Sequence, residues 1–566
     1  MCADILDLNE RRLERLPLRQ LSKELMRVPA RRRIELILER PDSAAVVAAL
    51  DPNDFFYFVQ EIGPDDSLPL LALARVDQLD HLFDLEWWRK DSLEPAKALI
   101  WLERLAKASD HKLLEWLYNA DFELLVSLCK QWITVATAPD DIDLVEARDF
   151  LPSKTLDDVY FWESTYPQYE DLLSHLLTVL FEVNYGFFKE LLNHTLLTVT
   201  TDVEEQAYHF HAARLADHAI PDFFEALEIY EPPKPDESPK RTFPEPADEE
   251  NPVPFFAIAL VPEGDFLDRV LRRMDNRDLA QTVQWELASL CNKVVVADQI
   301  PLDNTEALRQ GVEKALAYVN LGLELRSEDN VEAAGKIIED VYLEHLFRSA
   351  NSEISRITGR LHAVVQRGWL AQCPAGPRCL DGEWFEAADN LLAKTPKLLR
   401  TIPGQNAPDG FPRPDFFRTP ADIARGDFIV DVITAAGYLY DALSVDIRNI
   451  ELQLWEDGQV RLLEDITLGV MILTAAAQFL TAAKWDVKPL DVDLWPQLFP
   501  KLRSAEMDRV VMDWAFACVH ERQDRALTQA YLSPILRDYD FEMGSFSEQN
   551  PPEQQLVKFF LFREDH

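Results

Sequence analysis

The sequence predicts a mainly α-helical protein, and three observations support that prediction. Only 17 of the 566 residues are glycine, which disfavours folds that need many tight turns and bulges. Apolar residues recur three and four positions apart through much of the chain, as at Phe55, Phe56, Val59 and Ile62. Hydrophobic residues make up 47% of the chain, so it can bury a large core.

The first part of the chain, residues 1–136, reads as an array of short helices. Their starts follow turns such as Asp51-Pro52 and Ser92, where a side-chain oxygen can cap the first amides and proline tolerates the first helical position. Helices this short are unstable alone, so each must pack against its neighbours. The expected architecture is an α-superhelix or solenoid.

The next two regions differ in composition. Residues 137–230 first lose the helical period, and residues 155–162 could form one arm of a small hairpin before helices resume. Residues 231–254 contain eight prolines in 24 positions. This density of proline predicts an extended linker or a long surface loop.

Longer amphipathic segments in residues 255–566 predict a helical bundle. Residues 255–261 read as a short strand or the start of packed structure, and the residues from 541 onward as a loosely packed tail. Residues 466–483 carry no charge over 18 positions, which is near the length of a membrane span. Several alanines and threonines make the segment weakly hydrophobic, so a helix buried in a bundle is expected.

Two resemblances to known families follow from these segments. Residues 50–83 (LDPNDFFYFVQEIGPDDSLPLLALARVDQLDHLF) resemble the cytosolic N domain of MgtE-type magnesium transporters, and flagellar motor switch proteins have a related domain. This likeness extends over about residues 28–135 and implies a superhelix with a regulatory or docking role. Residues 204–232 and 255–274 resemble an uncharacterised family of large acidic helical bacterial proteins. That second resemblance covers most of the chain and implies no function.

The formal net charge is −42, and an acidic body of this kind repels phosphate groups. This argues against nucleic acid and against an anionic membrane surface as partners. Residues 11–40 differ, because ten basic and four acidic residues give this segment a charge of +6. A basic stripe there predicts an arm that docks on an acidic surface of its own body, of a second copy or of a partner. The alternative is an ordinary amphipathic first helix that covers the end of the solenoid. The stripe comprises Arg11, Arg15, Arg19, Lys23 and Arg27.

One helical segment carries candidate metal ligands. Glu204, His211 and His218 are seven residues apart and share one face, and such groups can bind zinc or iron. Two helical turns rise about 10 Å, so other helices would have to complete the site. The alternative is that all three are ordinary hydrogen-bonded residues of a helix face. Cys373 and Cys379 could likewise be unrelated thiols or form a reversible disulfide.

The favoured function is protein–protein interaction, as a scaffold or regulatory module that binds a protein partner or self-associates. No phosphate-binding loop, dinucleotide fingerprint or nucleophile elbow occurs, so no cofactor is predicted, and a divalent metal stays open. The acidic N-terminus and the six scattered cysteines favour a cytoplasmic location. Enzymatic activity is less favoured than binding. A metal-dependent enzyme with a site in the helical body and a divalent-cation-responsive regulator remain as alternatives.

Overall fold

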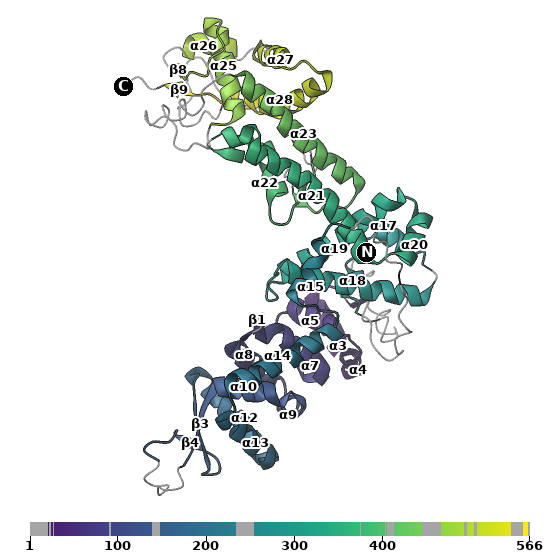
Figure 1. Ribbon diagram of the computed structural model, residues 1–566, viewed down its shortest axis with the longest axis vertical. Coiled ribbons are helices and arrows are strands. Elements are labelled where there is room, and N and C mark those ends of the chain that lie inside the picture. Colours follow the sequence, from purple (N-terminus) through teal and green to yellow (C-terminus); the bar gives the residue numbers. More distant parts are fainter. Residues whose placement is uncertain are drawn as a thin grey trace. The chain divides into compact units, whose positions relative to one another are not determined.

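The computed structural model describes residues 21, 24–25, 28–89, 92–138, 148–233, 241, 254–274, 276–373, 375–401, 403, 413–443, 466–491, 495–502, 506–544 and 559–563. The chain divides into two compact units. Unit 1 comprises Met1–Val319 and Asp329–Phe347, and unit 2 comprises Asn320–Glu328 and Arg348–His566. Helices dominate the described chain in Figure 1, which confirms the mainly α-helical fold. The proline-rich residues 231–254 lie within unit 1 and do not coincide with this division.

Unit 1 begins with short helices that stack on one another. They are α3 (Ala30–Leu38), α4 (Ser43–Ala48), α5 (Pro52–Ile62), α6 (Leu68–Leu73), α7 (Val76–Trp87), α8 (Pro95–Ala108), α9 (Asp110–Asn119) and α10 (Phe122–Trp132). Each helix from α3 to α8 packs on the next but one. A two-residue hairpin of β1 (Trp88–Arg89) and β2 (Ser92–Leu93) separates α7 from α8.

The starts and ends of these helices follow from local chemistry. The Asp51 side chain accepts a hydrogen bond from the Asn53 N–H at 2.8 Å and caps α5 ahead of Pro52. Gly63 ends the same helix with a φ of 99°, a conformation that favours glycine. The Ser109 hydroxyl accepts a hydrogen bond from the Lys112 N–H and caps α9.

A three-stranded antiparallel sheet with the order β3-β5-β4 follows α10. β3 (Ile133–Thr137) pairs with β5 (Tyr160–Ser164) along its length, and β4 (Lys154–Thr155) pairs with the other edge of β5. The hairpin arm expected at 155–162 therefore spans the end of β4, the turn and the start of β5. A short 3-10 turn η1 (Pro167–Tyr169) leads into the antiparallel helices α12 (Glu170–Val183) and α13 (Tyr185–Leu197).

The chain then returns to the array. α14 (Thr200–Asp217) packs on α10 and α7. The remaining elements of unit 1 are α15 (Phe223–Leu227), η2 (Glu228–Tyr230), α16 (Phe256–Ala259), α17 (Phe266–Leu271), α18 (Arg277–Ala297) and α20 (Val331–Asp340). α19 (Thr305–Ser327) and α21 (Leu343–Arg367) contribute residues to both units. Residues 255–261, read as a strand or as the start of packed structure, contain the helix α16 instead of a strand.

A buried carboxylate joins the helices before and after the proline-rich segment. Asp54 of α5 accepts hydrogen bonds from the backbone N–H groups of Phe255 and Phe256 at 2.8–2.9 Å. These are the first amides of α16, which would otherwise lack partners. Gln284 of α18 adds a 2.7 Å bond from its amide nitrogen to the Pro254 carbonyl. Burial, followed by the charge of Asp51, raises the pKa of Asp54 well above its usual value.

Arg241, inside the proline-rich segment, is also fixed to unit 1. Its fully buried side chain forms an ion pair with Glu286 of α18, with 2.9 Å between Nη1 and Oε1. Nη2 donates to the Val341 carbonyl at 3.0 Å, and the backbone N–H donates to the Asp340 carbonyl at 2.9 Å. Arg241 is thus anchored between α18 and the junction of α20 with α21.

Unit 2 contains longer helices that surround a second apolar core. Its elements, besides parts of α19 and α21, are η3 (Trp369–Gln372), η4 (Gly376–Cys379), α22 (Gly382–Leu392), β6 (Leu398–Leu399), β7 (Pro414–Asp415), α23 (Pro420–Ala442), α25 (Leu468–Ala482), β8 (Leu490–Asp491), α26 (Trp495–Leu502), α27 (Glu506–Cys518), α28 (Arg522–Met543) and β9 (Phe562–Arg563). α23 packs on α22, α27 and α28. Cys373 and Cys379 are both buried free thiols.

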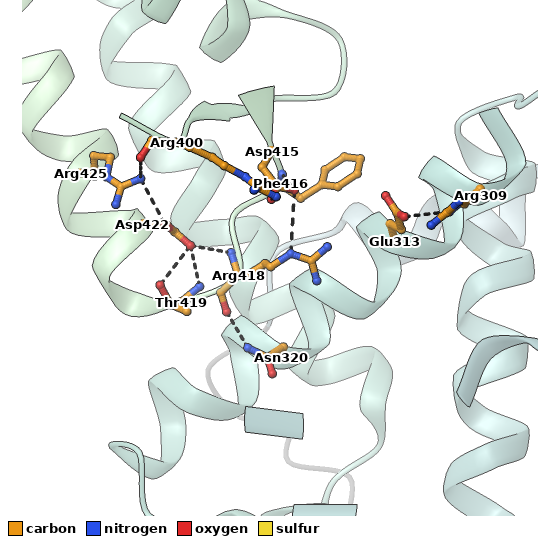
Figure 2. Close-up of polar contacts among 10 residues, drawn as sticks. All are labelled: Arg309, Glu313, Asn320, Arg400, Asp415, Phe416, Arg418, Thr419, Asp422 and Arg425. Carbon is orange, nitrogen blue, oxygen red and sulfur yellow. Dashed lines mark hydrogen bonds and ion pairs between the residues drawn. The ribbon is translucent and has the colours of Figure 1, made fainter. Parts of the chain in front are cut away.

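Figure 2 shows how α23 begins. The Asp422 carboxylate accepts hydrogen bonds from the Thr419 N–H and hydroxyl and from the Arg418 N–H, all at 3.0 Å. This is a capping box, which satisfies the free amides of the first turn. The Asn320 side chain donates to the Arg418 carbonyl at 2.8 Å and so ties the end of α19 to this cap.

The uncharged segment 466–483 forms α25, whose residues from Leu468 to Ala477 are all buried. Among the described residues, no helix combines the length and apolar composition that a membrane crossing requires. The tail differs from expectation. α28 continues to Met543, and β9, which contains the buried Phe562 and follows the buried Phe560, pairs in parallel with β8. Residues 560–562 therefore belong to the core of unit 2.

We predict that Asp54→Ala destabilises unit 1 by about 2–4 kcal/mol, because two buried N–H groups lose their acceptor. Asp54→Asn keeps one acceptor oxygen and should cost less. Urea unfolding followed by tryptophan fluorescence measures both effects. Asp66→Ala is the control, because Asp66 is exposed in the same array and should change stability by less than about 0.5 kcal/mol. Equal losses in Asp54→Ala and Asp66→Ala would contradict the prediction.

Candidate functional site

The segment with the candidate metal ligands forms α14, and its end is defined by the backbone. Ala219 has a φ of 58°, and the Ile220 N–H bonds to the Leu215 carbonyl at 2.9 Å, which closes the helix in a left-handed turn. His218 is the C-cap residue. Because α14 packs on α7 and α10, the polar groups of its inner face meet those of the array.

His211 and Arg214 of α14 share one buried carboxylate on α7. The Arg214 guanidinium binds Asp84 through two bonds of 2.6 and 2.7 Å and also binds Asp121. The His211 Nδ1 lies 3.3 Å from Asp84 Oδ1, and its ring stacks on Trp88 with centroids 4.6 Å apart. Asp84 is only 3% exposed, so this bidentate partner supplies the charge compensation that a buried carboxylate needs.

His218 meets a different partner, His81 of α7. The two rings contact edge to face, with centroids 4.6 Å apart. Neither ring nitrogen of His81 has a hydrogen-bond partner among the described residues, and its side chain is 2% exposed. Burial, and then the neighbouring His218, lowers the pKa of His81 well below its usual value, while burial lowers that of His218. Both imidazoles are therefore neutral near pH 7.

Asp80 lies one turn before Asp84 on α7 and accepts a 2.8 Å hydrogen bond from the indole N–H of Trp116. Burial raises the pKa of Asp80 to about 7, because the hydrogen bond from Trp116 and the charge of Arg214 offset the desolvation only in part. We call the polar residues where α14 contacts α7 and α10 the α7–α14 seam. It comprises Asp80, His81, Asp84, Asp121, His211, Arg214 and His218.

The seam does not gather the three proposed metal ligands around one point. His211 lies beside Asp84 and stacks on Trp88, His218 contacts His81, and Glu204 lies two turns before His211 on α14. Within the described residues, no group of three or more histidine, cysteine, aspartate or glutamate side chains is arranged to hold a metal ion. The other proposed set, the basic stripe of Arg11, Arg15, Arg19, Lys23 and Arg27, lies outside the described residues.

A cavity of about 160 Å³ opens beside the end of the seam, within unit 1. Its walls come from α5, α18, the end of α7 and the turn after α14. The amide nitrogen of Asn53 on α5 donates to the His218 carbonyl at 3.4 Å, and Asn292 of α18 donates to Asn53 Oδ1 at 3.3 Å. Both asparagines are almost fully buried, and they form the polar part of a mostly apolar wall.

A second buried polar cluster in unit 1 has Lys314 at its centre. The Lys314 ammonium group is 2.8 Å from the Tyr230 hydroxyl oxygen and 2.7 Å from Asp298 Oδ2. Tyr230 in turn donates to Asp298 Oδ1 at 2.8 Å. The three groups therefore satisfy one another in a closed triangle that fastens α19 to η2 and to the end of α18. We interpret this cluster as structural.

Comparison with known proteins identifies the family of the chain. Residues 10–563 match the family of unknown function DUF6178. The chain belongs to this family. The match agrees with the resemblance to an uncharacterised family, whereas the likeness of residues 28–135 to the N domain of MgtE-type transporters is not shown. No curated protein and no solved structure matches the chain.

Sequence reasoning found α14 but missed most of its partners. Nothing in the spacing of α7 marks Asp84 as the shared carboxylate, because acidic residues are abundant throughout this chain. Asn53 lies at the start of one helix and Asn292 lies within a long amphipathic helix, so neither position has a pattern that predicts a binding role. The cavity lies between Asn53 and Asn292, which are 239 positions apart in the sequence, so no local pattern could predict it.

We predict that Asp80→Asn stabilises the protein relative to wild type as pH rises from about 4 to 8. A carboxyl group whose folded pKa lies near 7, above its unfolded value of 3.8, contributes stability below pH 4 that is lost as pH rises through 7. Asparagine cannot ionise and can still accept the bond from Trp116. The difference in unfolding free energy should grow by a few kcal/mol over this range, measured by urea unfolding at each pH.

Asp77→Asn is the matched control on the same helix. Burial raises the pKa of Asp77, but the hydrogen bond and charge of Arg75 outweigh it and leave that pKa lowered. This variant should therefore lose stability relative to wild type as pH rises through the acidic range. The same pH trend in both variants would contradict the assignment for Asp80.

Proposed function

We propose that this protein is a protein-binding scaffold or regulatory module that engages its partner through an apolar surface on α12, α13 and the β4–β5 turn. The surface consists of Val159, Val183 and Tyr185, whose side chains are 47%, 60% and 45% exposed. Exposed apolar groups gathered in one place are typical of interaction sites. This grouping is the observation that supports the proposal most directly.

Contacts within unit 1 hold these three residues together. The Tyr185 hydroxyl donates to Asp157 Oδ2 at 3.3 Å, which fastens the β4–β5 turn carrying Val159 to the start of α13. Val183 ends α12, and only the helix cap Asn184 separates it from Tyr185. The Tyr185 ring also contacts Phe181 and the fully buried Phe188. A surface fixed in this way loses little conformational entropy on binding.

The charged residues around the surface define the chemistry of the partner. Glu182 and Asp158 are exposed, and the formal charge of the whole chain is −42. A partner that presents apolar side chains ringed by lysine or arginine would complement this surface. The chain itself carries one such segment, because residues 11–40 combine leucines with a charge of +6. Self-association through a second copy is therefore one form that the proposal takes.

The proposal is tested with Val183→Lys and Val183→Glu. Affinity capture from cells that make the tagged chain, followed by mass spectrometry, identifies the partner, and calorimetry with the purified partner measures Kd. Lysine places a positive charge opposite a basic partner and should weaken binding at least tenfold, about 1.4 kcal/mol. Glutamate at the same position should weaken it less. Sedimentation of the purified chain tests self-association with the same variants.

Phe541→Ser is the control, because Phe541 is an 85% exposed aromatic residue of unit 2. It should leave binding within twofold of wild type. Circular dichroism should show that all three variants fold, since each change is on the surface. If Val183→Lys captures the same proteins with the same affinity as wild type, the apolar surface is not the binding site.

A further inference from the structure

We propose that the cavity between α5 and α18 is a binding site for a small neutral ring compound that carries a hydroxyl or amide group. This inference goes beyond the protein-binding role, because it rests on a different part of unit 1 and on different residues. The cavity is lined by Asn53, Phe56, Tyr57, Leu85, Ile220, Asn292, Val295, Val296, Gln299, Ile300 and Leu302.

The size of the cavity sets the size of the ligand. Its volume of about 160 Å³ is close to that of an apolar cavity, about 150 Å³, that holds benzene in another protein. Aliphatic side chains form most of the wall, and Phe56 and Tyr57 add two aromatic rings. Tyr57 is held in place by stacking on Phe256, with centroids 4.2 Å apart. A single six-membered ring therefore fits this volume.

The polar groups of the wall specify one end of the ligand. Asn53 uses its carbonyl oxygen to accept the bond from Asn292, and its amide nitrogen donates to the His218 carbonyl. Among the described residues, no protein group hydrogen-bonds to the Asn292 carbonyl oxygen or to the Tyr57 hydroxyl. Both residues line the cavity, so the hydroxyl or amide of a ligand can bond to these two groups.

The wall also excludes charged ligands. Among the described residues that line the cavity, none is lysine, arginine, aspartate, glutamate or histidine. Tyr57 is neutral at physiological pH, since burial raises its pKa. A carboxylate or ammonium group would lose its hydration here without gaining a counter-charge. The geometry therefore favours a neutral compound over an ion.

The rim of the cavity has an unusual backbone. Gln299 follows α18 with a φ of 55°, in the left-handed region where a helix end usually has glycine. The Ile300 N–H bonds to the Val295 carbonyl at 3.0 Å and completes the turn. Glutamine at this position keeps an exposed amide side chain at the cavity rim, and strained residues of this kind occur often at ligand sites.

The test uses the full chain and three probes: phenol, benzene and benzoate. Isothermal titration calorimetry and saturation-transfer NMR measure binding of each. Phenol should bind saturably with one site per chain, benzene more weakly because it cannot hydrogen-bond to Asn292, and benzoate not measurably. Bound phenol should also raise the melting temperature, because it joins α5 to α18 in the folded state only.

Two variants locate the site. Val296→Phe fills the cavity and should weaken phenol binding at least tenfold, whereas Val199→Phe makes the same change at a 61% exposed valine and should have no effect. Asn292→Leu removes the polar end, and it should weaken phenol binding while leaving benzene binding equal or tighter. If Val296→Phe does not fold, Asn292→Leu still decides the question by the ratio of the two affinities.

The proposal is overturned if phenol fails to bind the wild-type chain, or if benzoate binds as tightly as phenol. It is also overturned if Val296→Phe folds and binds phenol like wild type. Loss of partner binding in Val183→Lys without any change in phenol binding would show that the cavity and the apolar surface act separately.

Discussion

The arrangement of unit 1 depends on the buried carboxylate of Asp54. Asp54 lies in α5 of the short-helix array. Its carboxylate accepts hydrogen bonds from the first amides of α16, which are 201 and 202 residues later in the sequence. It therefore joins the short-helix array to α16 and, through the bond of Gln284 to Pro254, to α18. The cavity beside Asn53 exists because α5 and α18 are held at this distance.

Burial affects the ionisable side chains of α7 differently, because each side chain has a different partner. Asp84 has Arg214 as a direct counter-charge, so it can be buried as a carboxylate. Asp80 has a hydrogen bond from Trp116 and a more distant charge on Arg214, which offset its burial only in part, and its pKa rises to about 7. His81 has no polar partner and stays neutral because its pKa is lowered. The seam thus joins α7 and α14 through one strong ion pair and several groups that are buried in uncharged form.

The fold class was predictable because helical periodicity and Asp-Pro helix starts are local features. The capping of α5 by Asp51 and the buried helix α25 follow directly from residues within a few positions of one another. The hairpin was predicted only in part, because the pairing of β3 with β5 needs the partner strand. The burial of residues 560–562 was missed, since a parallel pairing of Phe562 with Leu490 has no local pattern. The candidate site was predicted least well, because its partners come from helices far apart in the sequence.

The anchoring of Arg241 bears on how the chain can be divided. A proline-rich segment usually marks a place where two domains separate, yet here both flanks contact the same body of helices. Cutting the backbone between residues 242 and 253 would therefore not release two independent fragments. The piece that ends in Arg241 and the piece that starts before Phe255 would stay associated as a noncovalent complex. By the same reasoning, neither piece could be exchanged with an unrelated protein as a self-contained domain.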